Sequence, residues 1–148
     1  MAEVTPQGDA AVRMPGPQQG APHGGGGQGA GEVLLVCSGN TCRSPLAAAF
    51  FRRALEELRP GRAAAVSSAG LSALDGEPAT EPARQVAREW GLDLASHRAR
   101  RLTRADLEAA RLVLTMTAEH KRRVLEMAPE AAGKVYTLGE YAGVPGDV

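Results

Sequence analysis

Short runs of aliphatic residues alternate along this chain with longer segments whose apolar side chains recur at helical spacing. The first run, Val33 to Val36, is continuous and contains β-branched residues, which predicts a parallel strand buried on both faces. Ser44 and Pro45 follow as the N-cap and the first residue of a predicted helix, whose apolar stripe continues to Leu58. The pattern therefore predicts a strand, a turn and an amphipathic helix in succession.

The alternation of strand and helix signals continues to the end of the chain. We predict further strands at 63–67, 112–114 and 135–138, and helices at 80–90, after Thr103, and from Thr117 to about Met127. Gly70 is expected to break the second strand, and a loop with Gly and Pro to follow the last one. This order favours an α/β fold, an open parallel four-stranded sheet with helices on both faces. Ligands bind at the carboxyl ends of such strands, so the loop between the first strand and the first helix is the expected site.

The first 31 residues differ from the rest of the chain in composition. They contain nine of the 18 Gly, four of the 10 Pro and only three charged side chains. Such a segment cannot bury enough apolar surface to offset the entropy lost on ordering. We expect residues 1–31 to form a disordered tail and residues 32–148 to form one domain.

Charge and hydropathy exclude several classes of protein. Lys plus Arg and Asp plus Glu each number 17, so the formal net charge is zero. No global basic field would therefore hold nucleic acid or an anionic membrane. No apolar run approaches the ~20 residues of a membrane span, and no secretory signal pattern follows Met1. We expect a cytoplasmic monomer that binds neither nucleic acid nor membrane.

The two cysteines, Cys37 and Cys42, lie five positions apart. Secreted proteins held together by disulfides usually have more cysteines at wider spacing, and the three histidines are too scattered for a zinc site. We therefore predict no metal and no other cofactor. Two cysteines in a cytosolic chain are most often small buried hydrophobic residues, but the neighbours of these two favour chemistry.

The segment 37–44 (CSGNTCRS) joins the predicted strand directly to the predicted helix. Backbone N–H groups and the helix dipole favour an anion there, and the planar fork of Arg43 matches phosphate oxygens. The same groups would favour the thiolate of Cys37, which is the nucleophilic form. The Ser44 hydroxyl could donate to that thiolate, cap the helix, or do both. The segment is not a Walker loop, because the Gly-x4-Gly-Lys-Ser/Thr spacing is absent.

Residues 36–45 (VCSGNTCRSP) closely resemble the active-site loop of low-molecular-weight protein tyrosine phosphatases, and most of all their bacterial protein-arginine-phosphatase branch. The resemblance covers roughly residues 33–148 and includes the segments 67–70 (SSAG), 97–103 (HRARRLT), 112–117 (LVLTMT) and 136–141 (YTLGEY). It implies a phosphatase that acts on phosphorylated protein side chains without a cofactor.

The resemblance implies a role for each residue of the loop. Cys37 would attack phosphorus to form a phosphocysteine that water then hydrolyses, and Ser44 would stabilise the thiolate that leaves in this second step. The phosphate would be held by the loop amides and one guanidinium, from Ser38, Gly39, Asn40, Thr41, Cys42 and Arg43. Asn40, Ser68 and His97 resemble a supporting hydrogen-bond network that braces the loop, so the expected role of His97 is structural.

Alternatives remain open at two loop residues. Thr41 stands where many tyrosine-specific relatives have a bulkier aliphatic residue, which favours the guanidinium of phosphoarginine over phosphotyrosine. Alternatively, Thr41 only satisfies backbone groups of the loop. Cys42 would act as a redox guard that forms a thiol-recoverable disulfide with oxidised Cys37. Alternatively, Cys42 is a buried packing residue.

The general acid of the family, an Asp followed by Pro and an aromatic residue, has no match in this sequence. The chain stops at residues 146–148 (GDV), where no Pro follows Asp147, so the general acid is left unassigned. We expect a domain truncated at its C-terminus, either as a fragment or naturally, that turns over phosphate slowly, because a positioned acid contributes ~10²–10⁴-fold. A non-catalytic phosphate-binding module is one alternative. A thiol-based arsenate reductase is another, although that chemistry needs further cysteines and none follows Cys42.

Overall fold

The computed structural model describes residues 32–61 and 65–148. Four strands form one parallel sheet in the order β2-β1-β3-β4. Their bounds are β1 Glu32–Cys37, β2 Val66–Gly70, β3 Ala110–Thr115 and β4 Val135–Thr137. This sheet confirms the prediction of an α/β fold with an open parallel sheet of four strands. The predicted disordered tail, residues 1–31, lies outside the described residues.

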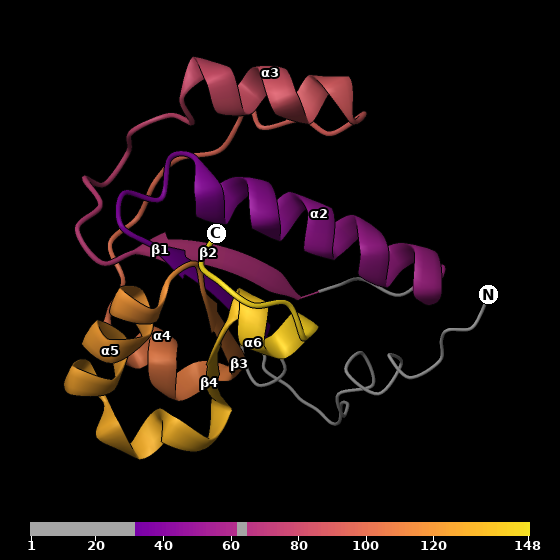
Figure 1. Ribbon diagram of the computed structural model, residues 1–148. Coiled ribbons are helices and arrows are strands. Elements are labelled where there is room, and N and C mark those ends of the chain that lie inside the picture. Colours follow the sequence, from indigo (N-terminus) through magenta and orange to yellow (C-terminus); the bar gives the residue numbers. More distant parts are fainter. Residues whose placement is uncertain (1–31, 62–64) are drawn as a thin grey trace.

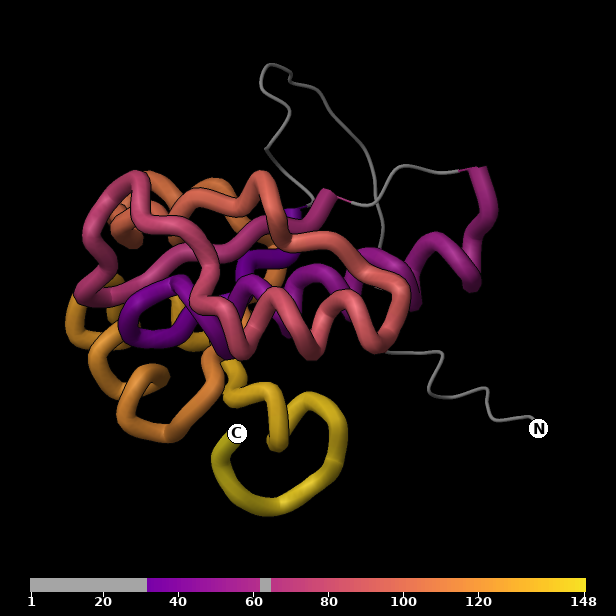
Figure 2. The backbone as a smooth tube through the Cα atoms, turned by 90° about the horizontal axis from the view of Figure 1, so that it is seen from above, coloured from indigo at the N-terminus to yellow at the C-terminus, as the bar shows by residue number. Residues whose placement is uncertain are grey.

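Helices cover both faces of the sheet, as Figure 1 shows. The α-helices are α2 Arg43–Leu58, α3 Glu81–Glu89, α4 Arg104–Ala109, α5 Ala118–Met127 and α6 Leu138–Ala142, and a 3₁₀ helix, η2, spans Pro129–Lys134. Apolar residues of α2 and α6 join the core on one face of the sheet, and those of α4, α5 and η2 join the core on the other. A third, alanine-rich cluster packs α3 against the outer side of α2 (Figure 2).

The central strand β1 is buried on both faces, which explains its continuous apolar sequence. Val33, Leu35 and Cys37 belong to the cluster shared with α2, whereas Leu34 and Val36 belong to the cluster shared with α4 and α5. All five residues are at most 3% exposed. The chain passes from β1 to β2 on one side and then crosses to β3 on the other. The carboxyl end of β1 is therefore the switch point of the sheet, where α/β proteins bind their ligands.

Three predicted strand boundaries were wrong. The second strand begins at Val66 rather than at 63, and residues 62–64 lie outside the described residues. Gly70 does not break this strand, because it pairs with Cys37 and its N–H donates to the carbonyl of Arg100 at 3.0 Å. The last strand ends at Thr137, since Thr137 and Glu140 form a capping box that starts α6 where a loop was expected.

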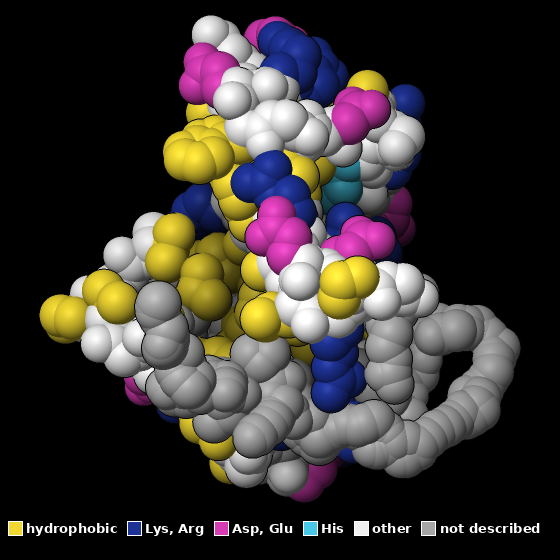
Figure 3. Space-filling view, turned by 90° about the vertical axis from the view of Figure 1, so that its right-hand side faces the viewer, with side chains coloured by type: hydrophobic (Ala, Val, Ile, Leu, Met, Phe, Trp, Pro, Cys, Tyr) yellow, Lys and Arg dark blue, Asp and Glu magenta, His cyan; other side chains and the backbone are white. Residues whose placement is uncertain are grey.

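One face of the molecule carries side chains of both charge signs. On the face shown in Figure 3, Lys and Arg side chains are interspersed with Asp and Glu. Within residues 32–61 and 65–148, no helix combines the length and apolar composition needed to cross a bilayer. In the same ranges no group of three or more His, Cys, Asp and Glu side chains could hold a metal ion.

Candidate active site

The loop 38–42 connects the end of β1 to the beginning of α2 and turns sharply at Asn40. Asn40 has a φ of 58°, in the left-handed region, which Asn adopts more readily than most residues. This turn directs the Asn40 N–H back to Cys37, where it donates to Sγ at 3.3 Å. The residue that ends the central strand is therefore already contacted by the loop that follows it.

The Cys37 thiol is buried and lies against a second buried polar group. Cys37 is 2% exposed and Ser44 is 0% exposed, and their Sγ and Oγ atoms are 2.9 Å apart. Asn40 Nδ2 donates to Ser44 Oγ at 2.9 Å. Because that oxygen already accepts a hydrogen bond, its own proton is free to be donated to Cys37 Sγ.

The prediction that Ser44 is the N-cap of the helix was wrong. The N-cap is Cys42, and α2 begins at Arg43. Ser44 lies inside the first turn, where its hydroxyl reaches the thiol instead of the helix backbone. In this described stretch the Cys42 side chain makes no capping hydrogen bond, so the first amides of α2 keep their capacity to bind an anion.

Asn40 holds the loop through its side chain as well as its backbone. Its second Nδ2 proton is donated to Ser68 Oγ at 2.9 Å, and its Oδ1 accepts the backbone N–H of Arg100 at 2.9 Å. His97 Nε2 lies 2.7 Å from the Asn40 carbonyl oxygen, so this ring nitrogen is the donor. The structure thus brings together Asn40, Ser68 and His97, the three residues that were expected to brace the loop.

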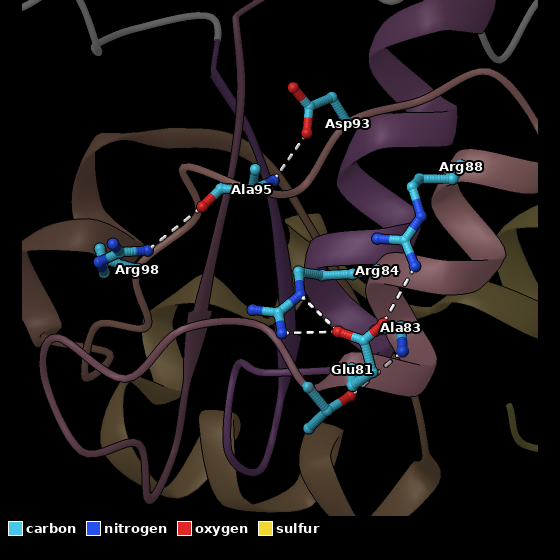
Figure 4. A network of polar contacts seen from close by, with 8 residues as sticks. Glu81, Ala83, Arg84, Arg88, Asp93, Ala95 and Arg98 are labelled. Atoms are coloured by element: carbon cyan, nitrogen blue, oxygen red, sulfur yellow. Dashed lines mark hydrogen bonds and ion pairs between the residues drawn. The ribbon is translucent and has the colours of Figure 1, made fainter.

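The segment around α3 supports the loop from outside. The backbone N–H of Thr80, the N-cap of α3, donates to the carbonyl of the half-buried Thr41 at 2.9 Å. Figure 4 shows the polar contacts that shape this region, including Glu81 with Arg84 and Arg88. Hydrogen bonds from the two arginines lower the pKa of Glu81, and the one from Arg84 has the larger effect.

The turn that presents His97 is held by contacts on either side of it, and Figure 4 draws those that Asp93 and Arg98 make with Ala95. The Asp93 carboxylate accepts the backbone N–H of Ala95 at 2.8 Å. Arg98 donates to the carbonyls of Ala95, at 3.5 Å, and His97, at 2.7 Å. The position of His97 against the loop is therefore fixed by its own neighbours in the chain.

Two more of the predicted residues, Cys42 and Arg43, lie at the surface side of the loop. Cys42 is exposed and its thiol is free, so the interpretation as a buried packing residue was wrong. The Arg43 guanidinium is half-buried and donates from Nη1 to the carbonyl of Val148 at 3.2 Å. Asp147, next to that residue, accepts the backbone N–H of Ala118 at the start of α5 at 2.9 Å.

Sequence reasoning missed one residue of the site, His120. Its Nε2 lies 2.9 Å from Ser38 Oγ, and the residue is only 4% exposed. The pKa of His120 is lowered from its usual 6.5. The largest cause is burial, and the positive charges of Arg43 and Arg123 contribute as well. His120 is the N3 residue of the capping box that begins at Thr117. In the sequence, the only sign of His120 is its position three residues after the predicted N-cap Thr117. That spacing predicts the start of a helix and not a contact with the loop.

Gly70 permits the loop to lie directly against β2. A Cβ atom at this position would lie 2.5 Å from the Ser38 carbonyl oxygen and 2.9 Å from the Asn40 nitrogen. Both are backbone atoms, which cannot move aside as a flexible side chain can. A glycine is therefore required here by close backbone approach rather than by an unusual φ.

The arrangement has the parts of a nucleophile placed at an anion-binding site. A buried thiol with two hydrogen-bond donors lies at the switch point of the sheet, below the uncapped N-terminus of a 16-residue helix. A helix N-terminus favours negative charge, and hydrogen bonds to sulfur favour the thiolate over the thiol. Such a site can bind a tetrahedral anion and attack its central atom.

Comparison with protein families gives a match over most of the chain. The model of a family described as low molecular weight phosphotyrosine protein phosphatase matches residues 32–146. The low molecular weight protein-tyrosine-phosphatase Wzb of Escherichia coli K12 is 43% identical over 109 residues, which are 74% of this chain and 70% of Wzb.

Solved structures of arginine phosphatases are similar as well. The YwlE arginine phosphatase of Geobacillus stearothermophilus superposes with a TM-score of 0.70 at 40% identity, covering 79% of this chain and 73% of that one. A Cys-to-Ser mutant of YwlE arginine phosphatase with a phosphorylated active site serine superposes with a TM-score of 0.70 at 38% identity, covering 78% and 75%.

The close approach at Gly70 can be tested by substitution to Ala. Gly70→Ala should lower the free energy of unfolding by about 1–3 kcal/mol, because the backbone of the loop must shift, and it should weaken the binding of sulfate. Urea denaturation and calorimetric titration with sulfate measure the two effects. Gly133→Ala is the matched control, since a Cβ there meets nothing within 4 Å. Unchanged sulfate affinity in Gly70→Ala would show that the contact does not shape the loop.

Proposed function

The chain belongs to the low molecular weight phosphotyrosine protein phosphatase family, and on that premise we propose that it hydrolyses phosphorylated protein side chains through a phosphocysteine at Cys37. The observation that supports this most directly is the pair of donors on Cys37 Sγ, the Ser44 hydroxyl at 2.9 Å and the Asn40 N–H at 3.3 Å. Both contacts direct a hydrogen-bond donor at the sulfur that is to attack phosphorus.

The proposed reaction has two displacements at phosphorus. The Cys37 thiolate attacks, the bond to the substrate side chain breaks, and the departing group takes up a proton from water, because no general acid is assigned. Water then attacks the phosphocysteine, the S–P bond breaks, and phosphate leaves while Cys37 returns to the thiolate. Ser44 acts chiefly in this second step, because its hydroxyl proton can stabilise the departing sulfur.

The phosphoryl oxygens would be held by the amides of residues 38–43 and by Arg43. The first amides of α2 and the loop offer neutral donors, to which Arg43 adds a planar charged fork. Arg43 is the first residue of α2, so its backbone and side chain both belong to the site. Its guanidinium would exchange the carbonyl of Val148 for a bidentate contact with the phosphoryl group.

We favour phosphoarginine as the substrate, with phosphotyrosine next. Thr41 supports this preference, because it is a small polar residue, half-buried in the loop, whose backbone carbonyl is held by Thr80. Its hydroxyl could accept from a guanidinium, whereas a phosphotyrosine ring usually packs against an aromatic or aliphatic wall. The chain is similar both to a tyrosine phosphatase and to an arginine phosphatase, so both substrates are compared experimentally below.

Cys42 supports a further part of the proposal, protection of the nucleophile against oxidation. Its free thiol is exposed at the end of the loop, five residues after Cys37. When a peroxide oxidises the Cys37 thiolate to a sulfenic acid, the Cys42 thiol would condense with it to a disulfide and release water. A thiol reductant would restore both cysteines. We also propose a cytoplasmic location, because thiols are kept reduced in that compartment.

Burst kinetics with an aryl phosphate test the proposed function. The protein should release one equivalent of aryl alcohol rapidly and then turn over at a slower, constant rate, because a phosphocysteine forms before it is hydrolysed. Cys37→Ala should lose both phases while it still binds sulfate. Alanine is preferred to serine, since a YwlE Cys-to-Ser mutant carries a phosphorylated active site serine. Sulfate binding without a burst in the unaltered protein would indicate a phosphate-binding module instead.

Substrate preference is tested at Thr41 with peptides that carry phosphoarginine or phosphotyrosine. The ratio of kcat/KM values should favour phosphoarginine in the unaltered protein and fall by about tenfold or more in Thr41→Ile, which removes the hydroxyl and adds bulk. Thr41→Val, which has nearly the shape of Thr, separates the hydroxyl from the bulk. If the ratio is unaltered in both variants, Thr41 does not select the substrate and only satisfies backbone groups of the loop.

The role of Cys42 is tested by recovery from oxidation. After brief peroxide treatment and then a thiol reductant, the unaltered protein should regain most of its activity. Cys42→Ser should not, because Cys37 then proceeds to sulfinic acid, which thiols do not reduce. Mass spectrometry of the oxidised protein should find a Cys37–Cys42 bridge. If the two proteins regain the same fraction of their activity, Cys42 does not protect Cys37 against irreversible oxidation.

A further inference from the structure

His120 links the N-terminus of α5 to the residue that follows the nucleophile. Its ring makes two hydrogen bonds. Nε2 lies 2.9 Å from Ser38 Oγ, and Nδ1 accepts the backbone N–H of Thr117 at 3.2 Å. The two residues bonded through Nε2 are 82 positions apart in sequence. The ring is buried, so neither contact competes with bulk water.

The second of these contacts fixes the position of the ring proton. Nδ1 accepts from the Thr117 N–H, so it carries no proton, and the single proton of the neutral ring is on Nε2. Nε2 therefore donates to Ser38 Oγ. Since the Ser38 oxygen accepts this bond, its own hydroxyl proton can be directed elsewhere. The Ser38 carbonyl is meanwhile held by the Ser72 N–H at 2.9 Å, so Ser38 is fixed by its side chain and its backbone.

We propose that neutral His120 is a positioning residue of the phosphatase site, which holds Ser38 so that its amide and its hydroxyl proton face the bound phosphoryl group. This inference rests on the proposed function but concerns anion binding, which can be measured without turnover. His120 differs in this respect from His97, which holds the Asn40 carbonyl. The two histidines brace the loop at different residues.

The charges around His120 favour its neutral form. Arg43 from α2 and Arg123 from α5 oppose protonation, as burial does, whereas Asp147 and Glu119 favour it, and the net effect lowers the pKa. Well above pH 6.5 the ring is therefore neutral in the folded and the unfolded protein. As the pH falls below 6.5 the unfolded chain takes up the proton first, so acid weakens the folded state. Below the lowered pKa, His120 is protonated in the folded state as well. Nδ1 then carries a proton and can no longer accept the Thr117 N–H, so the two N–H groups repel each other.

Sulfate binding tests the proposal, because sulfate does not titrate between about pH 5 and pH 8. At pH 7, Ser38→Ala and His120→Leu should each weaken sulfate binding about tenfold, the effect expected from a displaced loop. The double variant should be no weaker than either single one, since both remove the same hydrogen bond. Thr117→Ala is the control: it removes the capping hydroxyl of α5 but leaves the bond between His120 and Ser38 in place.

The pH profile supplies a second, independent readout. Acid should change the sulfate affinity of the unaltered protein, because protonated His120 repels the Thr117 N–H and the ring must shift, and Ser38→Ala, which is already uncoupled, should show a flatter profile. If His120→Leu does not fold, Ser38→Ala and this comparison still decide the question. Sulfate affinity that is unchanged in Ser38→Ala, losses that multiply in the double variant, or an equal loss in Thr117→Ala would overturn the proposal. A burst in the unaltered protein, measured in parallel, shows separately whether the proposed function holds.

Discussion

The hydrogen bonds of one buried amide, Asn40, hold the structure of the site. The side chain is 0% exposed, and it uses both Nδ2 protons and Oδ1 in bonds to Ser44, Ser68 and the backbone of Arg100. A buried polar group that loses its partner costs about 1–3 kcal/mol. Any movement of the loop would break several of these bonds at once, so the loop has one favoured shape.

The topology of the sheet supplies the partners of this amide. Ser68 lies on β2, beside the central strand, and Arg100 and His97 lie on the segment that returns past the end of β2. His120 reaches the loop from the other side of the switch point, at the start of the helix that follows β3. Parallel strands end at the same edge, so segments that are distant in sequence meet there.

The proposed site favours an anion although the chain has no net charge. The attraction is local, because it comes from the dipoles at the start of α2, which has no side-chain cap, and from Arg43. Burial, and then the charge of Arg43, lower the pKa of His120 and favour its neutral form. Fixed dipoles in a buried site cost no reorganisation when charge develops on a bound group. A neutral surface with mixed charges, as in Figure 3, is compatible with this design.

The sequence by itself determined the features that depend on residues close together in the chain. The buried run of β1, the N-caps Thr80, Thr103 and Thr117, and the loop between β1 and α2 follow from patterns within a few positions. Only the tertiary structure decided that Ser44 serves the thiol rather than the helix, that Gly70 continues β2, and that His120 contacts Ser38. Each of these depends on a partner from another element, at 2.9 Å across 82 positions in the last case. A local pattern carries no information about such a partner, because the packing of the sheet and its helices brings the two residues together.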